Sequence, residues 1–255
     1  MSWEDDYKRK IVSLEEMAKQ IKSGDFIMLG LALGAPTPRV IHAILDRAEA
    51  LEKVSMCDAV PVYPSKLLSP DFMKTIDGHI NHLSGFFSPG GRAQGHPGLS
   101  PFVPVMSSDA AKKVAPLADV FICQVTPPNK RGYVNLGLTN FHEMDTIRLG
   151  RQIGKQRLTI GEVNDQMPIV FGDNWLDISE FDLFVETSMK MPAITRSAPG
   201  TKEATIGQYV LELINDGDTI QMGFGGIPEA VVAGLEGKHD LGVLTEMFPV
   251  GLEEL

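Results

Sequence analysis

An internal repeat constrains the fold of this chain more than any other feature of its sequence. Residues 23–30 read SGDFIMLG, and residues 216–223 read DGDTIQMG, 193 positions later. Each copy follows an amphipathic helical pattern and leads through a glycine-containing turn to a proline and a second helical pattern. Such units bury their apolar faces against further units of the same kind. Among the 255 residues, we therefore expect one complete α/β unit, residues 1–197, and the beginning of a second, residues 198–255.

Local patterns predict the helices and strands of the first unit. Ser13 and Glu16 form an S-x-x-E capping box before one helix, and Thr37 and Pro38 pair an N-cap with a proline at the first position of another. Continuous apolar runs are typical of strands buried on both faces of a parallel sheet. These runs span residues 26–33, 53–57, 118–125, 157–163 and 182–186. The alternation predicts an α/β fold with a mainly parallel sheet and flanking helices.

The composition excludes several classes of protein. Hydrophobic residues make up 43% of the chain and charged residues 22%, as in folded globular proteins and unlike disordered ones. The net charge is −10, and the densest basic run, residues 8–10, lies beside acidic residues, so we expect no nucleic-acid partner. The acidic start of the chain does not resemble a signal peptide, and no apolar run reaches the roughly 18 residues of a membrane span. We expect a soluble, cytoplasmic protein without a membrane partner.

Cysteine and histidine spacings argue against a metal site. Cys57 and Cys123 each lie alone in an apolar stretch, which predicts two reduced thiols in the core. His79 and His82 have a spacing that fits one helix face, but no carboxylate accompanies them in the sequence. We therefore expect no metal.

A glycine-rich turn follows the second copy of the repeat. Residues 223–228 read GFGGIP and lie between a predicted strand and a predicted helix. Gly223, Gly225 and Gly226 would let a ligand approach backbone N–H groups at the start of the helix. The dinucleotide fingerprint fails at Pro228, and the turn lacks the lysine and hydroxyl residue of a P-loop. An oxyanion-binding turn and a plain tight turn both fit these residues.

Glu246 directly follows Thr245 after the apolar run at residues 241–244, which predicts a short strand. Open α/β sheets place their sites at the carboxyl ends of parallel strands, so this carboxylate is a candidate for chemistry. A solvated glutamate at a strand end is the alternative that the residues alone leave open.

Several short motifs occur in a fixed order along the chain. They are ADV at 118–120, QVTPP at 124–128, GYVNLG at 132–137, EVN at 162–164, MP at 167–168, QMG at 221–223, GGIP at 225–228 and TEMF at 245–248. In these motifs the chain resembles the acetyl-CoA hydrolase/transferase family, the family I CoA-transferases that include 4-hydroxybutyrate and butyrate–acetate CoA-transferases. The resemblance begins near Gly24 and continues to the last residue.

The resemblance implies a CoA-transferase, NagB-RpiA-like fold and makes Glu246, in the T/S-E-M motif, the nucleophile. The implied reaction moves CoA between a short-chain acyl-CoA and a carboxylate such as acetate, by way of a glutamyl-CoA thioester. Coenzyme A is then a substrate, and no cofactor is expected. The glycine-rich turn would contribute oxyanion donors or make room for the thioester. Gly34 and Pro36, in the turn at residues 30–36, and the glycine- and proline-rich loop at 84–104 would line the substrate pocket.

The chain also departs from the family pattern. Family members are longer and carry a complete second α/β domain with a further glycine-rich motif, so we expect a homo-oligomer or a partner chain that completes this domain. Residues 145–155 differ from the usual pattern. We expect Arg148 and Arg151 on a solvated helix face; contacts with a partner subunit or with the CoA phosphates are the alternatives. The alternatives are an acyl-CoA hydrolase, an inactive or regulatory fragment, and a sugar-phosphate isomerase, although no basic phosphate-binding cluster is evident.

Overall fold

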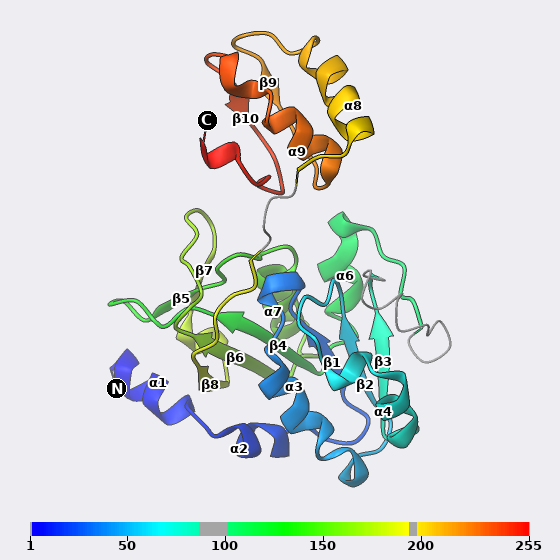
Figure 1. Cartoon of the computed structure of the whole chain (residues 1–255). Coiled ribbons are helices and arrows are strands. Elements are labelled where there is room, and N and C mark those ends of the chain that lie inside the picture. Colours follow the sequence, from blue (N-terminus) through cyan, green and yellow to red (C-terminus); the bar gives the residue numbers. More distant parts are fainter. Residues whose placement is uncertain (1, 87–100, 194–197, 255) are drawn as a thin grey trace. The chain divides into compact units, whose positions relative to one another are not determined.

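The chain divides into two compact units, Met1–Pro192 and Ala193–Leu255 (Figure 1). The structure is a computed structural model, and it describes residues 2–86, 101–193 and 198–254. The sequence places the end of the first unit five residues later, at residue 197, within a segment outside the described residues. The expected loop at residues 84–104 also lies mostly outside them.

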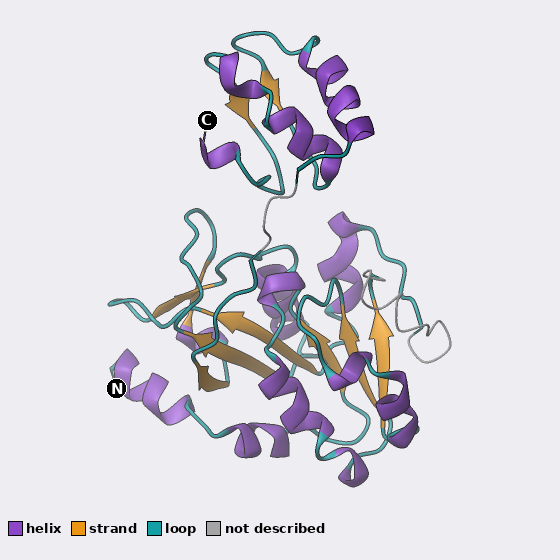
Figure 2. Cartoon of the chain, in the orientation of Figure 1, coloured by secondary structure: helices purple, strands orange, loops and turns teal. Residues whose placement is uncertain are grey.

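The larger unit is built on a central sheet (Figure 2). The sheet has six strands in the order β3-β2-β1-β4-β6-β8. Every neighbouring pair is parallel, which confirms the predicted α/β fold. β1 is shorter than the predicted strand, because the chain turns at Gly30 into a short 3-10 helix, Ala32–Gly34. The strands are β1 (Phe26–Leu29), β2 (Val54–Asp58), β3 (Ile80–Ser84), β4 (Val120–Val125), β6 (Leu158–Asn164) and β8 (Leu183–Thr187).

Short helices connect these strands, and both predicted helix starts are confirmed. Ser13 and Glu16 form the reciprocal capping box of α2, and Thr37 is the N-cap residue of α3 with Pro38 as its first residue. The α-helices are α1 (Trp3–Lys10), α2 (Leu14–Lys19), α3 (Pro38–Leu45), α4 (Pro70–Thr75), α6 (Ala110–Val114) and α7 (Glu143–Gln152). Further 3-10 helices span Ala48–Ala50, Lys66–Leu68, Ser107–Asp109 and Ile178–Glu180.

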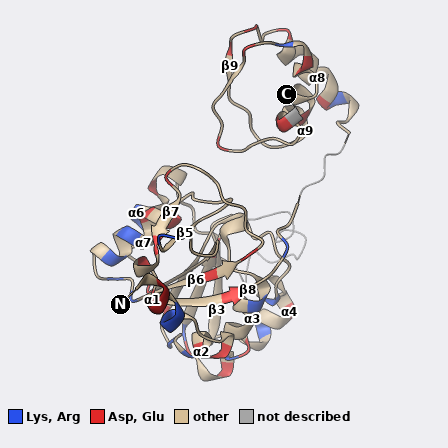
Figure 3. Cartoon of the chain, turned by 90° about the vertical axis from the view of Figure 1, so that its left-hand side faces the viewer, with Lys and Arg blue, Asp and Glu red and all other residues tan. Residues whose placement is uncertain are grey.

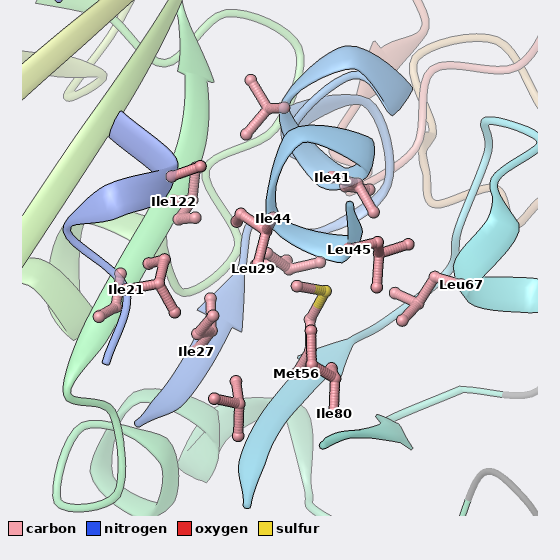
Figure 4. Packing of buried hydrophobic residues seen from close by; sticks show 14 of the residues in the cluster. Ile21, Ile27, Leu29, Ile41, Ile44, Leu45, Met56, Leu67, Ile80 and Ile122 are labelled. Atoms are coloured by element: carbon pink, nitrogen blue, oxygen red, sulfur yellow. The ribbon is translucent and has the colours of Figure 1, made fainter. Parts of the chain in front are cut away.

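Both faces of the sheet are buried, and successive residues of a strand enter different cores. In β4, Ile122 packs in the core beneath α2, α3 and α4, whereas Phe121 and Cys123 pack in the second core against α7. Figure 4 shows the first core, where Ile27 and Leu29 of β1 meet Ile44 of α3. The second core also takes apolar residues from an antiparallel pair, β5 (Tyr133–Asn135) and β7 (Trp175–Asp177). Cys57 and Cys123 are free and buried, as predicted.

Each of the two outer strands of the sheet, β3 and β8, forms an isolated β-bridge with a neighbouring segment. Val12 N donates to Phe184 O at 2.9 Å beside β8, and Val103 N donates to Ser84 O at 2.9 Å beside β3. These contacts satisfy some of the backbone hydrogen-bonding groups at the two edges of the sheet. Unpaired groups at a strand edge are free to pair with other chains. The segment along β8 begins with α1, whose acidic first turn and basic last turn complement the helix dipole (Figure 3).

The strand order reverses direction between β1 and β4. From β1 the chain proceeds to β2 and β3 on one side, and from β4 to β6 and β8 on the other. The turns that follow these two central strands therefore diverge, which is where open α/β sheets form a crevice.

The smaller unit repeats the beginning of the larger one. Its elements are α8 (Thr201–Leu211), β9 (Thr219–Ile220), α9 (Gly226–Val232) and β10 (Gly242–Val243), with 3-10 helices at Leu235–Gly237 and Leu252–Glu254. β9 and β10 pair in parallel, as β1 and β2 do. A small core of Met222, Val231, Val232, Leu235 and Leu252 joins them. The predicted helix is present as α8, but it ends at Leu211, before Leu213 of the predicted apolar stripe, and Ile206, Tyr209 and Leu213 are exposed.

Among the helices of the described residues, none combines the length and the apolar character that a membrane crossing requires.

Candidate active site

Glu246 lies in the smaller unit, just beyond the end of β10. The ladder between β9 and β10 closes with the bond from Leu244 N to Ile220 O, at 3.0 Å, and the chain then leaves the sheet. The Glu246 side chain is exposed. It borders a hollow of about 530 Å³ that is lined by Thr219, Ile220, Gln221, Leu244, Thr245 and Glu246. The structure therefore places the predicted nucleophile at the carboxyl end of a parallel strand, beside a hollow large enough for a small acyl group.

The residue before the glutamate makes two polar contacts. Thr245 Oγ1 lies 2.6 Å from Met222 O and 2.9 Å from Met247 O, so its hydroxyl donates toward carbonyl groups of two separate segments. Met222 is the last residue before the glycine-rich turn, and Met247 is the first residue after Glu246. The hydroxyl thus links the two segments that the sequence singled out.

The glycine-rich turn adopts a conformation that requires glycine. Gly225 has φ 130° and ψ 179°, a region that other residues almost never occupy, and it is the N-cap residue of α9. The turn borders a different hollow, of about 480 Å³, together with Phe224, Pro228, Glu203 and Glu229. Gly223, Gly225 and Gly226 are therefore in the same unit as Glu246, but Gly225 and Gly226 line a separate hollow. Their role as oxyanion donors stays a prediction.

The repeat shows how the second copy differs from the first. Phe26 pairs with Ser55 in the larger unit, and Thr219, its repeat equivalent, pairs with Gly242. Counting four residues onward from each partner aligns Ala59 with Glu246. The two units thus pair their first two strands in the same register. β10 is shorter than β2, and the second unit has Glu246 at the position where the first has the methyl group of Ala59.

Gly34 and Pro36 are both buried in the turn after β1. Gln124, in β4, holds this turn: its Nε2 donates to Leu33 O at 3.2 Å and to Ala35 O at 2.6 Å. Asn164, in β6, donates in turn to Gln124 Oε1 at 2.9 Å. The pocket role of Gly34 and Pro36 stays a prediction. Their turn itself is held by the hydrogen bonds from Gln124, which Asn164 in turn orients.

Glu143 fixes the same turn from the opposite side. Its carboxylate is completely buried and accepts hydrogen bonds from Leu31 N at 2.7 Å, Phe141 N at 2.7 Å and His142 N at 2.9 Å. The sequence offered no signal for this role, because Glu143 reads as an ordinary acidic residue in the first turn of a helix.

Glu162 is a second buried carboxylate at the carboxyl edge of the sheet. Thr37 donates to it twice, from its backbone N and from its hydroxyl, each at 2.6 Å. The hydroxyl is therefore used for Glu162 and not for capping α3. Burial raises the pKa of Glu162 to about 7, because the charged form loses its hydration, although the bonds from Thr37 and the nearby Arg39 favour that form.

This pKa predicts a pH-dependent loss of stability. In the unfolded chain the carboxyl releases its proton near its ordinary pKa of 4.5, whereas the folded state retains it up to about pH 7. Between these values the folded state binds more protons, so the free energy of unfolding falls as the pH rises. The loss is on the order of 3 kcal/mol across this window.

We expect Glu162→Gln to remove most of this dependence of the unfolding free energy on pH. The amide keeps one acceptor for Thr37 but has no group that titrates in this range. Denaturant unfolding between pH 4.5 and 8 measures the effect, with the exposed Glu49→Gln as the control. An unchanged slope in Glu162→Gln would contradict the assignment.

His82 has a carboxylate partner that the sequence did not reveal. His82 lies in β3 and not on a helix, and its Nε2 is 3.1 Å from Asp58 Oδ1 in the neighbouring β2, with both side chains buried. The expectation that no carboxylate accompanies His82 is therefore wrong, because the partner comes from another strand. Among the described residues, no group of three or more histidine, cysteine or acidic side chains could hold a metal ion.

Arg148 and Arg151 lie on α7, but both are paired. Arg148 Nε is 3.3 Å from Glu180 Oε2, and Arg151 Nη2 is 2.8 Å from Asp182 Oδ2. The two arginines are thus partly exposed, as expected, but both form salt bridges to the segment before β8.

The parallel sheet and the second copy of its first strands, with Glu246 just beyond β10, define an α/β protein of repeated units with a carboxylate near a strand end. A family model, "Acetyl-CoA hydrolase/transferase N-terminal domain", matches residues 1–196. The chain belongs to the acetyl-CoA hydrolase/transferase family, as its motifs indicated.

Individual relatives agree with this assignment. A 4-hydroxybutyrate coenzyme A transferase of Clostridium kluyveri is 27% identical over 259 residues, which cover 100% of this chain and 58% of the relative. A succinyl-CoA:cyclohexane-1-carboxylate CoA transferase of Geobacter metallireducens is 30% identical over 257 residues, which cover 100% of this chain and 56% of that relative. The crystal structure of RipA from Yersinia pestis is similar with a TM-score of 0.86 at 26% identity, over 100% of this chain and 60% of RipA. The chain thus spans a little over half the length of these proteins.

Proposed function

We propose that this chain carries the nucleophile of an acyl-CoA:carboxylate CoA-transferase, with Glu246 as the attacking group. The substrates are a short-chain acyl-CoA and a carboxylate such as acetate, and coenzyme A takes part as a substrate, with no separate cofactor. The exposed Glu246 at the end of β10, beside the hollow of about 530 Å³, carries this proposal. The names of the relatives, which are CoA transferases, support it.

The chemistry follows from a carboxylate nucleophile. Glu246 attacks the thioester carbonyl of the acyl-CoA, and the carbon–sulfur bond breaks, giving an acyl-glutamyl anhydride and CoA thiolate. The thiolate then attacks the glutamyl carbonyl of the anhydride, releasing the first carboxylate and leaving a glutamyl-CoA thioester. An incoming carboxylate attacks this thioester to form a new anhydride. The freed thiolate finally attacks the new acyl carbonyl, which yields the second acyl-CoA and restores Glu246.

Each addition step places negative charge on a carbonyl oxygen. Fixed N–H donors aimed at this oxygen are typically worth about 3–4 kcal/mol each. Gly223, Gly225 and Gly226 are our candidates for such donors or for a close passage of the thioester. The buried turn with Gly34 and Pro36, held by Gln124 and Glu143, is our candidate for part of the acyl pocket.

Two measurements on this chain test the proposal. Incubation with acetyl-CoA followed by borohydride is expected to reduce a glutamyl-CoA thioester, and peptide mass spectrometry is expected to locate the reduced residue at Glu246. Labelled acetate is expected to exchange into acetyl-CoA. Hydrolysis of acetyl-CoA without exchange would identify a hydrolase, and the absence of both adduct and exchange would contradict the proposal for this chain.

A further inference from the structure

The segment that carries Glu246 has few attachments to the rest of its unit. The backbone ladder of β9 and β10 ends at Leu244, and Met247 and Phe248 are 44% and 66% exposed. In the part of the chain that the structure describes, the hydrogen bonds of residues 245–248 are those of the Thr245 hydroxyl. Backbone pairing and apolar packing therefore do little to fix the position of Glu246.

The Thr245 hydroxyl is placed where it can supply that fixation. Its oxygen is 2.6 Å from Met222 O, in the segment that continues β9, and 2.9 Å from Met247 O, on the far side of Glu246. Both partners are carbonyl oxygens, so each contact needs a donor on Thr245. One hydroxyl hydrogen is shared between these two carbonyl oxygens. The shared hydrogen bond connects the residues on either side of Glu246 to the segment that follows β9.

The other copy of the repeat secures the equivalent turn differently. Asp58 occupies the position of Thr245 and contacts His82, and Ala32 N donates to the carbonyl of Ala59 at 3.2 Å. In the larger unit a side chain and a backbone donor from neighbouring segments thus hold the turn. The bridge through a threonine hydroxyl occurs in the copy that has Glu246 at the next position, where the larger unit has Ala59.

We propose that Thr245 is a positioning residue for the nucleophile, an inference that rests on the function proposed for Glu246. Its hydroxyl holds the Glu246 backbone in the orientation from which the carboxylate reaches a thioester carbonyl. In this role Thr245 acts through Glu246: although it also lines the hollow beside the glutamate, its hydroxyl is directed to the two backbone carbonyl groups. Removing the hydroxyl should therefore lower the rate of the attack and leave the KM for acyl-CoA nearly unchanged, because small misplacements of a reacting group are costly in rate.

The test compares variants that differ in the hydroxyl. Thr245→Val keeps the branched shape without the donor, Thr245→Ala removes both, and Thr245→Ser keeps the donor. We expect the valine and alanine variants to form the Glu246 adduct and to turn over about 10- to 100-fold more slowly. The serine variant should stay within about threefold of the wild type.

Thr205→Val is the matched control. It also removes a hydroxyl that donates to a carbonyl, Thr201 O at 2.8 Å, but on α8 of the same unit. We expect it to react at the wild-type rate. An unimpaired Thr245→Val, a serine variant as slow as valine, or an equally slow Thr205→Val would overturn the proposal.

Hydrogen exchange at the Leu244 amide separates this proposal from the proposed function. Leu244 N donates to Ile220 O directly before the bridge, so its exchange should be several-fold faster in Thr245→Val and unchanged in Thr245→Ser. This readout needs no catalysis. If the wild type forms no adduct, the proposed function fails, and Leu244 exchange still decides whether Thr245 anchors the segment. Unchanged exchange in Thr245→Val would overturn the anchoring role.

Discussion

Glu246→Ala is expected to abolish both CoA transfer and the borohydride-trapped adduct. Without its carboxylate the protein has no group at this position that can form the anhydride, and loss of a covalent nucleophile lowers kcat by roughly 10⁴-fold or more. The Glu246 side chain is exposed, and its backbone lies beyond the end of β10. The substitution should therefore change the free energy of unfolding by less than about 0.5 kcal/mol. The activity loss should therefore occur in a fully folded protein.

Two further substitutions at this position sharpen the test. Glu246→Gln keeps the shape of the side chain but removes the nucleophile, so it should be as inactive as alanine. Glu246→Asp keeps a carboxylate but withdraws it by one methylene, and it should retain a small, measurable rate. Glu212→Ala, an exposed glutamate at the end of α8, is the control and should be fully active. A Glu246→Ala protein with wild-type turnover would exclude the proposed mechanism.

The elements that the sequence predicted well are those specified by neighbouring residues. A capping box such as that of Ser13 and Glu16 joins residues three positions apart, and an apolar run such as β4 marks a strand buried on both faces. The placement of Glu246 after a strand followed from the same local reasoning and from the repeat. Where a strand ends was harder to predict, because Gly30 and Leu31 continue the apolar run while the chain already turns.

The unpredicted features depend on residues far apart in the chain. Thr37 and Glu162 are 125 positions apart, and Leu31 and Glu143 are 112 apart, so no local pattern could pair them. Asp58 and His82 meet because β2 and β3 are neighbours, a fact fixed by the strand order. The role of Thr245 was also hidden, because a threonine next to a glutamate does not reveal which carbonyl groups surround its hydroxyl.

Glu143 supports the largest stability prediction. Its carboxylate binds the backbone N–H groups of Leu31, Phe141 and His142, and it is completely buried. Glu143→Ala would leave these donors without their acceptor and open a cavity beside the turn after β1. Each unsatisfied buried donor costs about 1–3 kcal/mol, and partial access of water to the turn moderates the sum. We expect the larger unit to lose on the order of 3–5 kcal/mol of unfolding free energy.

Denaturant unfolding of the variants measures this loss, and Asp145→Ala is the matched control. Asp145 lies two residues further along the same helix turn but is exposed, so its removal should cost less than about 0.5 kcal/mol. Glu143→Gln should fall between the wild type and alanine, because its one carbonyl oxygen cannot serve both Leu31 on one side and the pair of Phe141 and His142 on the other. Hydrogen exchange should then be fastest at the Leu31 amide in Glu143→Ala. A Glu143→Ala protein as stable as Asp145→Ala would show that the turn after β1 is held by Gln124 and its packing, and not by this buried carboxylate.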